Sequence, residues 1–198
     1  MSAPARGRRP GSSTTRADIL AAARALFARQ GYERASMRAI ARRAHVDPAL
    51  IVHFFGSKEG LLREALTLPV DPTRVIGDAL ADVPPERRGE ALVRGVVTAW
   101  DSPAVNPVLS SLFRTAVSHD MAATFLRETL QRTVIAAVSG FLDDEAAHRR
   151  AELVAAQMAG LALSRYLIQL PAVVEMTPDE LARSVGPSVQ HYLTGTLT

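Results

Sequence analysis

The sequence predicts an all-α protein divided into two domains, and three observations support this interpretation. Apolar residues recur at helical spacing along most of the 198 residues, and prolines and glycines separate these segments. The sequence has neither alternating runs of β-branched residues nor Asn-Gly or Asp-Gly turns, so strand signals are missing. Residues 1–68 carry a formal charge of +7 and residues 69–198 a formal charge of −4. A basic domain before an acidic one is typical of a phosphate-binding surface with a separate task behind it, although arginines can also merely cover solvated helices.

The first 14 residues are rich in Ser, Pro, Gly and Arg, so we predict that residues 1–14 form a disordered basic arm. Its arginines either reach along a nucleic acid, as basic arms do, or belong to an inert leader, and the composition does not separate these two readings. Thr15 with Asp18 resembles a capping box, which predicts that the first helix begins there. Ile19, Ala23 and Phe27 then recur at helical spacing until Gly31 ends the helix. The three arginines of the arm are Arg6, Arg8 and Arg9.

Residues 36–61 carry the signals of a helix-turn-helix, whose second short helix is built to lie in the major groove of DNA. Two short helices that cross at a wide angle need a small residue where they touch, and Ala41 supplies it. The turn needs a residue that tolerates a left-handed backbone. His45 occupies that place, and histidine is among the non-glycine residues that adopt positive φ most readily.

The second helix of this motif has a clear beginning and an apolar side. Asp47 is a capping carboxylate, and Pro48 follows it at the first helical position, where proline is favoured. Val46 and Ile51 are apolar and are expected to hold the helix against the rest of the motif. Ser57 then begins a further helix with an apolar stripe of leucines and alanine. Residues 15–68 are therefore predicted to form one compact four-helix unit.

This segment resembles the DNA-binding head of the TetR family of one-component transcriptional regulators. The matching positions are Gly31-Tyr32, Ser36 through Ala44, Val46, Pro48, Leu50, Phe55 and Gly56 through Leu61. The resemblance implies a homodimer, most often a repressor, whose heads bind a near-palindromic operator in double-stranded DNA. It also implies that residues 69–198 form a helical domain for effector binding and dimerisation, in which a small molecule releases the DNA.

The chain departs from the family pattern at three places. His45 replaces the usual glycine of the turn, Ala49 replaces a glycine early in the recognition helix, and Val52-His53-Phe54 stands where tyrosine-x-histidine is usual. The missing tyrosine hydroxyl removes one phosphate contact, while Val52 can touch a thymine methyl or pack. The residues expected to contact DNA are Ser36, Arg38, Arg42, Asp47, Ala49, Leu50, Val52, His53 and Lys58. An alternative function is a helical small-molecule-binding or adaptor protein that has lost specific DNA binding.

Beyond residue 68 the pattern is one of successive helices. They are expected at 73–82, 86–101, 104–118, 120–141, 144–169 and 178–194. Helical bundles hold ligands in apolar cavities with a few polar groups, so large side chains of this domain are candidates to line one, although each is more often an ordinary core residue. The candidates are Trp100, Phe113, Met121, Phe125, Met158 and Tyr166. Because few charges lie inside these helices, we expect an apolar or weakly polar effector.

The resemblance also implies that the last long helices form the dimer interface. On that basis the interface residues are Val154, Gln157, Leu161, Arg165 and Ile168, with packing inside one subunit as the alternative. Dimerisation has a physical basis of its own, because two heads one helical turn apart discriminate far better between sequences than one head does.

Signals of catalysis are sparse. The chain has no cysteine, and its five histidines are scattered without the spacing of metal ligands. Neither a phosphate-binding loop nor a Gly-x-Ser-x-Gly elbow occurs in the sequence. No apolar stretch follows the first arginines, and no window approaches the length of a membrane span. We therefore expect a cytoplasmic protein that is not an enzyme and needs no metal or cofactor.

Overall fold

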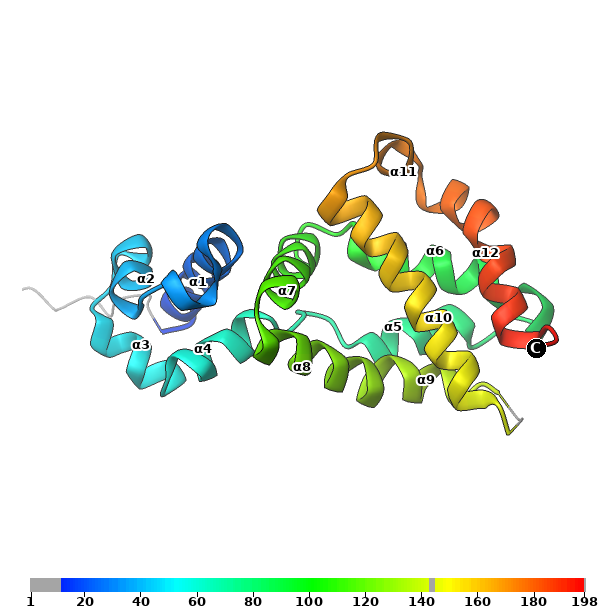
Figure 1. Cartoon of the computed structure of the whole chain (residues 1–198), viewed down its shortest axis with the longest axis horizontal. Helices are drawn as coiled ribbons and strands as arrows, with labels where there is room; N and C mark the ends of the chain where they lie inside the picture. The colour runs from blue at the N-terminus through cyan, green and yellow to red at the C-terminus, as the bar shows by residue number, and fades with distance from the viewer. Residues whose placement is uncertain (1–11, 143–144, 198) are drawn as a thin grey trace, which may run out of the picture. The chain divides into compact units, whose positions relative to one another are not determined.

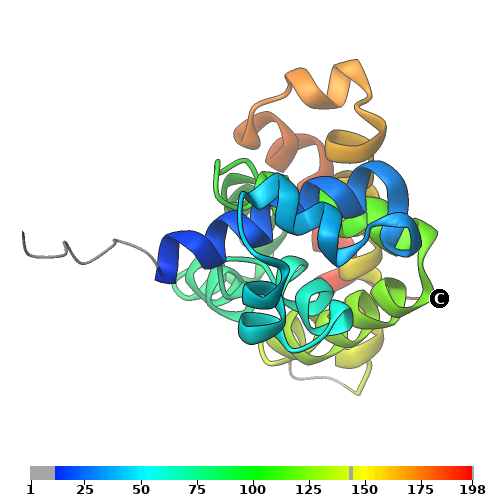
Figure 2. The ribbon, with the colours of Figure 1, turned by 90° about the vertical axis from the view of Figure 1, so that its left-hand side faces the viewer.

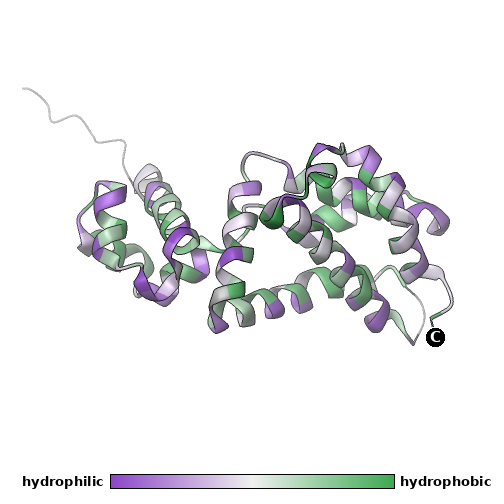
Figure 3. Ribbon diagram, turned by 45° about the horizontal axis from the view of Figure 1, so that its top comes forward, coloured by the Kyte–Doolittle hydropathy of each residue, from purple (hydrophilic) through white to green (hydrophobic). Residues whose placement is uncertain are grey.

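The computed structural model describes residues 12–142 and 145–197, and every element in that part of the chain is a helix. The chain divides between Ala65 and Leu66 into two compact units, which are described separately below (Figure 1). The all-α prediction is confirmed. In each unit the hydrophobic residues lie mainly on the sides of the helices that face one another (Figure 3), so each unit has an apolar interior of its own.

The first unit consists of four helices. They are α1 (Ser12–Arg34), α2 (Met37–Ala44), α3 (Pro48–Phe55) and α4 (Lys58–Ala65). α1 begins at Ser12, so Thr15 lies within it and does not cap it, and residues 12–14 are helical where an arm was predicted. The remaining arm residues, with Arg6, Arg8 and Arg9, lie outside the described residues. Gly31 adopts φ 79° and interrupts the regular helix where the sequence predicts its end, and helical backbone resumes as far as Arg34.

The turn between α2 and α3 has the left-handed residue that the sequence predicts. His45 has φ 55° and ψ 40°, and its N–H donates to the carbonyl of Arg42. The next N–H, that of Val46, donates to the carbonyl of Ala41 over 3.0 Å. These two bonds satisfy carbonyls at the end of α2 that would otherwise lack partners. The tight turn sets α3 at a wide angle to α2 (Figures 1 and 2).

The second unit consists of helices and shorter helical segments. They are α5 (Pro72–Leu80), the 3-10 turn η1 (Pro85–Arg87), α6 (Arg88–Trp100), α7 (Asn106–Ser118), α8 (Asp120–Thr129), the π-helical η2 (Leu130–Ile135), α9 (Ala136–Ser139), α10 (Ala147–Ala162), the π-helical η3 (Leu163–Ile168), α11 (Pro171–Glu175) and α12 (Pro178–Thr194). The predicted helix 120–141 is present as α8, η2 and α9 in succession, and the predicted helix 144–169 as α10 and η3. α11 was not predicted.

α6 and α12 cross closely in the second unit. A Cβ atom on Gly89 would lie 2.4 Å from the carbonyl oxygen of Gly186, so a side chain at residue 89 would force the helices apart. The amide of Gln190 strengthens the crossing. Its Oε1 accepts from the N–H of Gly89 over 2.8 Å, and its Nε2 donates to the carbonyl of Pro85 over 2.9 Å. The start of α6 is therefore fixed to α12.

Candidate functional site

The beginning of α3 is fixed by its own sequence. Asp47 has extended backbone angles, and its Oδ1 accepts from the N–H of Ala49 over 2.7 Å. Pro48 occupies the first turn, where its missing N–H leaves no bond unmade. This cap starts the helix at Pro48 and leaves the Asp47 side chain exposed at its amino end.

α3 has one buried side and one exposed side. Ile51 is fully buried and Phe55 is 7% exposed, so these two side chains hold the helix in the first unit. Leu50 and Val52 are 39% and 54% exposed. Ala49 and His53 are exposed as well. The structure thus brings together the α3 residues of the predicted DNA contacts on the side of α3 that the first unit does not cover.

The predicted phosphate contacts lie mostly on or before α2. Ser36 caps α2, because its hydroxyl accepts from the N–H of Ala39 over 3.1 Å. Arg38 and Arg42 are exposed, and among the described residues neither has an ion-pair partner. Their charges are therefore free to meet an external anion.

Lys58 is held differently from these arginines. Its Nζ donates to the carbonyl of Glu33 over 3.2 Å and lies 4.2 Å from the centre of the Tyr32 ring. The hydroxyl of Tyr32 donates in turn to Glu59 Oε1 over 2.9 Å. Burial of the Tyr32 hydroxyl, followed by its bond to Glu59, raises the pKa of this phenol above its ordinary value. These contacts fix the start of α4 to the end of α1, a positioning role that spacing alone did not reveal.

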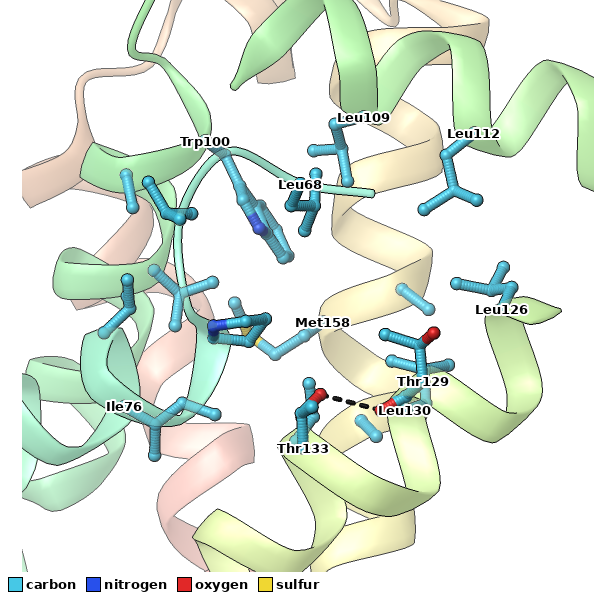
Figure 4. A pocket seen from close by; sticks show the side chains of 18 of the residues that line it. Leu68, Ile76, Trp100, Leu109, Leu112, Leu126, Thr129, Leu130, Thr133 and Met158 are labelled. Carbon is cyan, nitrogen blue, oxygen red and sulfur yellow. Dashed lines mark hydrogen bonds between the residues drawn. The ribbon is translucent and has the colours of Figure 1, made fainter. Parts of the chain in front are cut away.

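The second unit contains a cavity of about 360 Å³. It is bounded by the residues that precede α5 and by α5, α6, α7, α8, η2, α9 and α10 (Figure 4). Its lining residues are almost all apolar, and four of the six predicted candidates are among them. These four are Trp100, Phe113, Phe125 and Met158.

Two predicted candidates do not line the cavity. Met121 is 43% exposed near the start of α8, where its side chain faces solvent. Tyr166 is buried, but it supports the wall from behind, because its ring meets that of Trp100 edge-on with 6.2 Å between the centroids. The large side chains of this domain therefore occupy three kinds of place: the cavity lining, the layer that packs behind it, and the surface. Residue type alone did not distinguish them.

A charged cluster secures Trp100 from outside the cavity. Asp101 accepts hydrogen bonds from Arg165 through both carboxylate oxygens, over 3.1 and 2.9 Å. Asp101 Oδ1 also accepts from the hydroxyl of Tyr166 over 2.7 Å. Burial, followed by this bond to Asp101, raises the pKa of Tyr166. Arg165 Nη1 donates further to the carbonyls of Val173, Val174 and Met176, and so attaches the segment around α11 to the end of α6.

The predicted dimer residues do not share one surface. Val154 and Leu161 are buried within the protomer, and Val154 lines the cavity. Only 10% of the Arg165 side chain is exposed, because Asp101 and the carbonyls near α11 surround it. These three residues are corrected to internal packing. Gln157 is half-buried, and Ile168 is 64% exposed.

The exposed side of α10 carries a leucine and two small residues. Leu153, Ala156 and Gly160 are exposed at successive helical turns. Apart from its chain neighbours and the nearby backbone of α10 itself, no atom of the protomer lies within 4 Å of a Cβ placed on Gly160. A glycine inside a helix costs about 1 kcal/mol relative to alanine. The protomer itself therefore gives no packing reason for glycine at this place.

Residues 12–142 and 145–197 form neither a metal-binding cluster nor a membrane-spanning helix. No group of three or more His, Asp or Glu side chains in these residues is arranged to hold a metal ion. In the same residues, no helix is both long and apolar enough to cross a membrane.

Comparison with known proteins agrees with this architecture. The family described as "Bacterial regulatory proteins, tetR family" matches residues 19–65, and "Tetracyclin repressor-like, C-terminal domain" matches residues 86–193. The chain is 37% identical to a TetR-family regulator from Streptomyces coelicolor A3, with a TM-score of 0.68 over 95% of this chain and 99% of that one. A TetR-like transcriptional regulator from Rhodococcus sp. RHA1 is 18% identical, with a TM-score of 0.68 over 95% and 100% of the two chains.

A third solved structure, NalD of Pseudomonas aeruginosa, is the secondary repressor of the MexAB-OprM multidrug efflux pump. It is 21% identical, with a TM-score of 0.66 over 91% of this chain and 96% of that one. At these low identities, the Rhodococcus and Pseudomonas proteins show a shared fold. No curated protein matches the sequence.

Proposed function

Because the chain belongs to the TetR family of bacterial regulatory proteins, we propose that it is a cytoplasmic repressor released from its operator by a small molecule. Family membership makes it a DNA-binding transcriptional regulator and not an enzyme. The observation that carries the proposal is α3, a capped helix with Ile51 buried beneath it and an uncovered outer side. The repressor role is supported by the match of residues 86–193 to a domain family described as tetracycline repressor-like.

We propose that α3 enters the major groove with Asp47, Ala49, Leu50, Val52 and His53 toward the base edges. Ala49, Leu50 and Val52 can make apolar contact with thymine methyl groups, and His53 can bond a base or a phosphate. Ser36, Arg38 and Arg42 would contact the phosphates on either side. Lys58, held over the Tyr32 ring, would add a charge at the start of α4, where the helix dipole also favours an anion.

Removing one of the free arginines should weaken binding to all DNA sequences alike. A plot of log K against log salt concentration has a negative slope. For Arg38→Ala and Arg42→Ala we expect the magnitude of this slope to decrease by about one each, because one phosphate contact is lost. Arg74→Ala is the matched control, since that side chain is 82% exposed in the second unit. Titrations of labelled duplex at several salt concentrations measure the slope. An unchanged slope in both α2 variants, or an equal change in the control, contradicts the proposal that these arginines contact DNA phosphates.

We propose that the protein acts as a homodimer through the exposed side of α10, formed by Leu153, Ala156 and Gly160. Small residues at successive turns allow two helices to approach closely, which gives Gly160 the packing role that it lacks in one protomer. On α12, which packs beside α10, small or polar residues are exposed in the same unit and can extend this face. They are Ser184, Pro187, Ser188 and His191.

A large side chain on this face should separate the protomers without unfolding them. We expect Ala156→Arg to elute as a monomer and to lose at least tenfold in affinity for a two-half-site operator, because one head makes too few base contacts. Ala123→Arg is the control, since Ala123 is an exposed alanine on α8. Light scattering gives the mass, and circular dichroism shows whether both variants stay folded. A dimeric Ala156→Arg protein contradicts the interface.

We propose that the effector occupies the cavity and acts on the first unit through the chain that joins the two units. α4 ends at Ala65, and the next three residues, Leu66, Thr67 and Leu68, line the cavity. A ligand that displaces these residues pulls on α4 directly. It shifts the protein away from DNA only by its difference in affinity between the two states.

Selection from a random duplex library tests the proposal as a whole. The full chain should retain double-stranded DNA in dilute buffer and enrich a near-palindromic site with half-sites about one helical turn apart. Replacing Ala49 or His53 should change the enriched sequence. A folded sample that retains no duplex at low salt contradicts the regulatory function and favours a small-molecule-binding or adaptor protein.

A further inference from the structure

We propose that the effector is an uncharged lipophilic molecule with a hydrogen-bond acceptor, such as a ketone or ester oxygen, and that the cavity rejects ions. This inference rests on the proposed regulatory function and names the chemical class of ligand for its site. It follows from the charges, the free hydrogen-bonding groups and the volume of the cavity.

The cavity wall carries no ionisable side chain among the described residues. Its 25 lining residues are aliphatic, aromatic or Met, apart from three threonines. An ion transferred into such a place loses its water shell and gains no opposite charge in return, which costs several kcal/mol. The three threonines are Thr67, Thr129 and Thr133.

The charged residues that follow the wall are already bound to each other. Asp101 comes directly after the lining residue Trp100, but both of its oxygens accept from Arg165, and one also accepts from Tyr166. The guanidinium of Arg165 is bound further by the three carbonyls near α11. Neither charge is free to meet a charged ligand.

The wall instead offers neutral hydrogen-bonding groups. The indole of Trp100 lies in the cavity near Leu68 and Met158 (Figure 4), and its N–H can only donate. Within the described part of the chain, this N–H has no acceptor, and the hydroxyl of Thr129 likewise has no hydrogen-bond partner. The hydroxyl of Thr133 donates to the carbonyl of Thr129 over 2.7 Å, so only its acceptor capacity remains. A ligand oxygen would therefore be met by Trp100 and Thr129.

The cavity also limits the size of the ligand. Its volume of about 360 Å³ lies near the lower end of the range for ligand pockets. Thr129 is the last residue of α8, and Thr133 lies in the π-helical η2 that follows it. Turns of π-helix are frequent at functional sites. The ligand is thus a small, mostly hydrocarbon molecule with few polar atoms.

Two probes with eleven carbons each, 2-undecanone and undecanoate, separate neutral from charged ligands. Trp100 is the only tryptophan in the chain and lines the cavity, so its fluorescence reports occupancy. At pH 8 we expect the full-length protein to bind the ketone at least tenfold more tightly than the carboxylate. The apparent Kd of undecanoate should fall about tenfold for each pH unit between 8 and 6, because only the protonated acid enters. Equal affinities at pH 8, or no binding of the ketone, overturn the proposal.

Variants that lack the indole N–H or the hydroxyl test the two hydrogen-bonding groups, Thr129→Val with almost the same shape and Trp100→Phe with a smaller ring. Trp100→Phe and Thr129→Val should each weaken ketone binding about three- to tenfold by calorimetry, the usual range for one hydrogen bond. Thr124→Val is the matched control, because Thr124 lies on α8 outside the cavity lining and should bind the ketone like the parent. Unchanged affinity in both cavity variants overturns the role of the acceptor.

These measurements need no DNA, so they separate the ligand class from the regulatory function. A ketone that binds as expected but leaves the operator complex intact supports the ligand class and contradicts release by this site. A protein that fails to retain DNA but discriminates between the probes supports the ligand class and contradicts the DNA-binding proposal alone.

Discussion

Ile51→Ser is expected to destabilise the first unit by about 2–4 kcal/mol and to abolish retention of duplex DNA. Ile51 is fully buried on the inner side of α3. Serine leaves a cavity in its place and buries a hydroxyl without a partner, and both effects oppose folding. Because α3 is only eight residues long, it has no stability of its own once this contact is lost. Urea unfolding followed by circular dichroism measures the loss.

Val52→Ser is the matched control for this experiment. It changes the neighbouring residue of the same helix to the same side chain, but Val52 is 54% exposed. We expect its stability to stay within about 0.5 kcal/mol of the parent, as for surface substitutions, while its sequence preference changes. The two units can unfold in separate transitions. DNA retention is therefore measured as well, as a second readout for the unfolding of the first unit. Equal stabilities of the two variants would contradict the placement of α3.

Asp101→Ala is expected to destabilise the second unit by about 3 kcal/mol. Its removal leaves the Arg165 guanidinium, only 10% exposed, without its carboxylate, and an unpaired charge in such surroundings is strongly unfavourable. Tyr166 loses its acceptor at the same time. Because Tyr166 supports Trp100, the fluorescence of that tryptophan should also change in the folded variant.

The exposed pair of Arg94 and Asp179 supplies the comparison. Their side chains are 42% and 63% exposed, so Asp179→Ala should cost less than about 1 kcal/mol. Thermal unfolding of both variants beside the parent tests this difference. If Asp101→Ala melts like Asp179→Ala, the cluster of Asp101, Arg165 and Tyr166 does not stabilise the second unit.

The fold of the first unit could be predicted because its signals are local. The cap at Asp47, the proline after it and the left-handed turn at His45 each act within a few residues, and all agree on one motif. The start of α1 was placed three residues too late, because Thr15 with Asp18 resembles a cap that the helix does not use. Helix ends depend on weak local preferences and are therefore predicted less well than the helices themselves.

The second unit was less predictable because its decisive contacts are distant in sequence. Arg165 has the character of a surface residue, yet it is covered, since Asp101 lies 64 residues earlier in the chain and neutralises it. α10 has apolar or small residues on more than one side, so periodicity did not tell Val154, which faces the protomer interior, from Leu153, which does not. α11 has only five residues, too few for a periodic pattern.

The close crossing of α6 and α12 has a mechanical consequence. α6 is secured at its first turn, where Gln190 binds Gly89, and at its last, where Asp101 binds Arg165. Because α6 is held at both ends, it should move little when a ligand occupies the cavity. We therefore expect a bound ligand to displace Leu66 to Leu68 more readily than α6, and this part of the cavity lining is continuous with α4. The rigidity of α6 thus directs the movement caused by ligand binding toward α4.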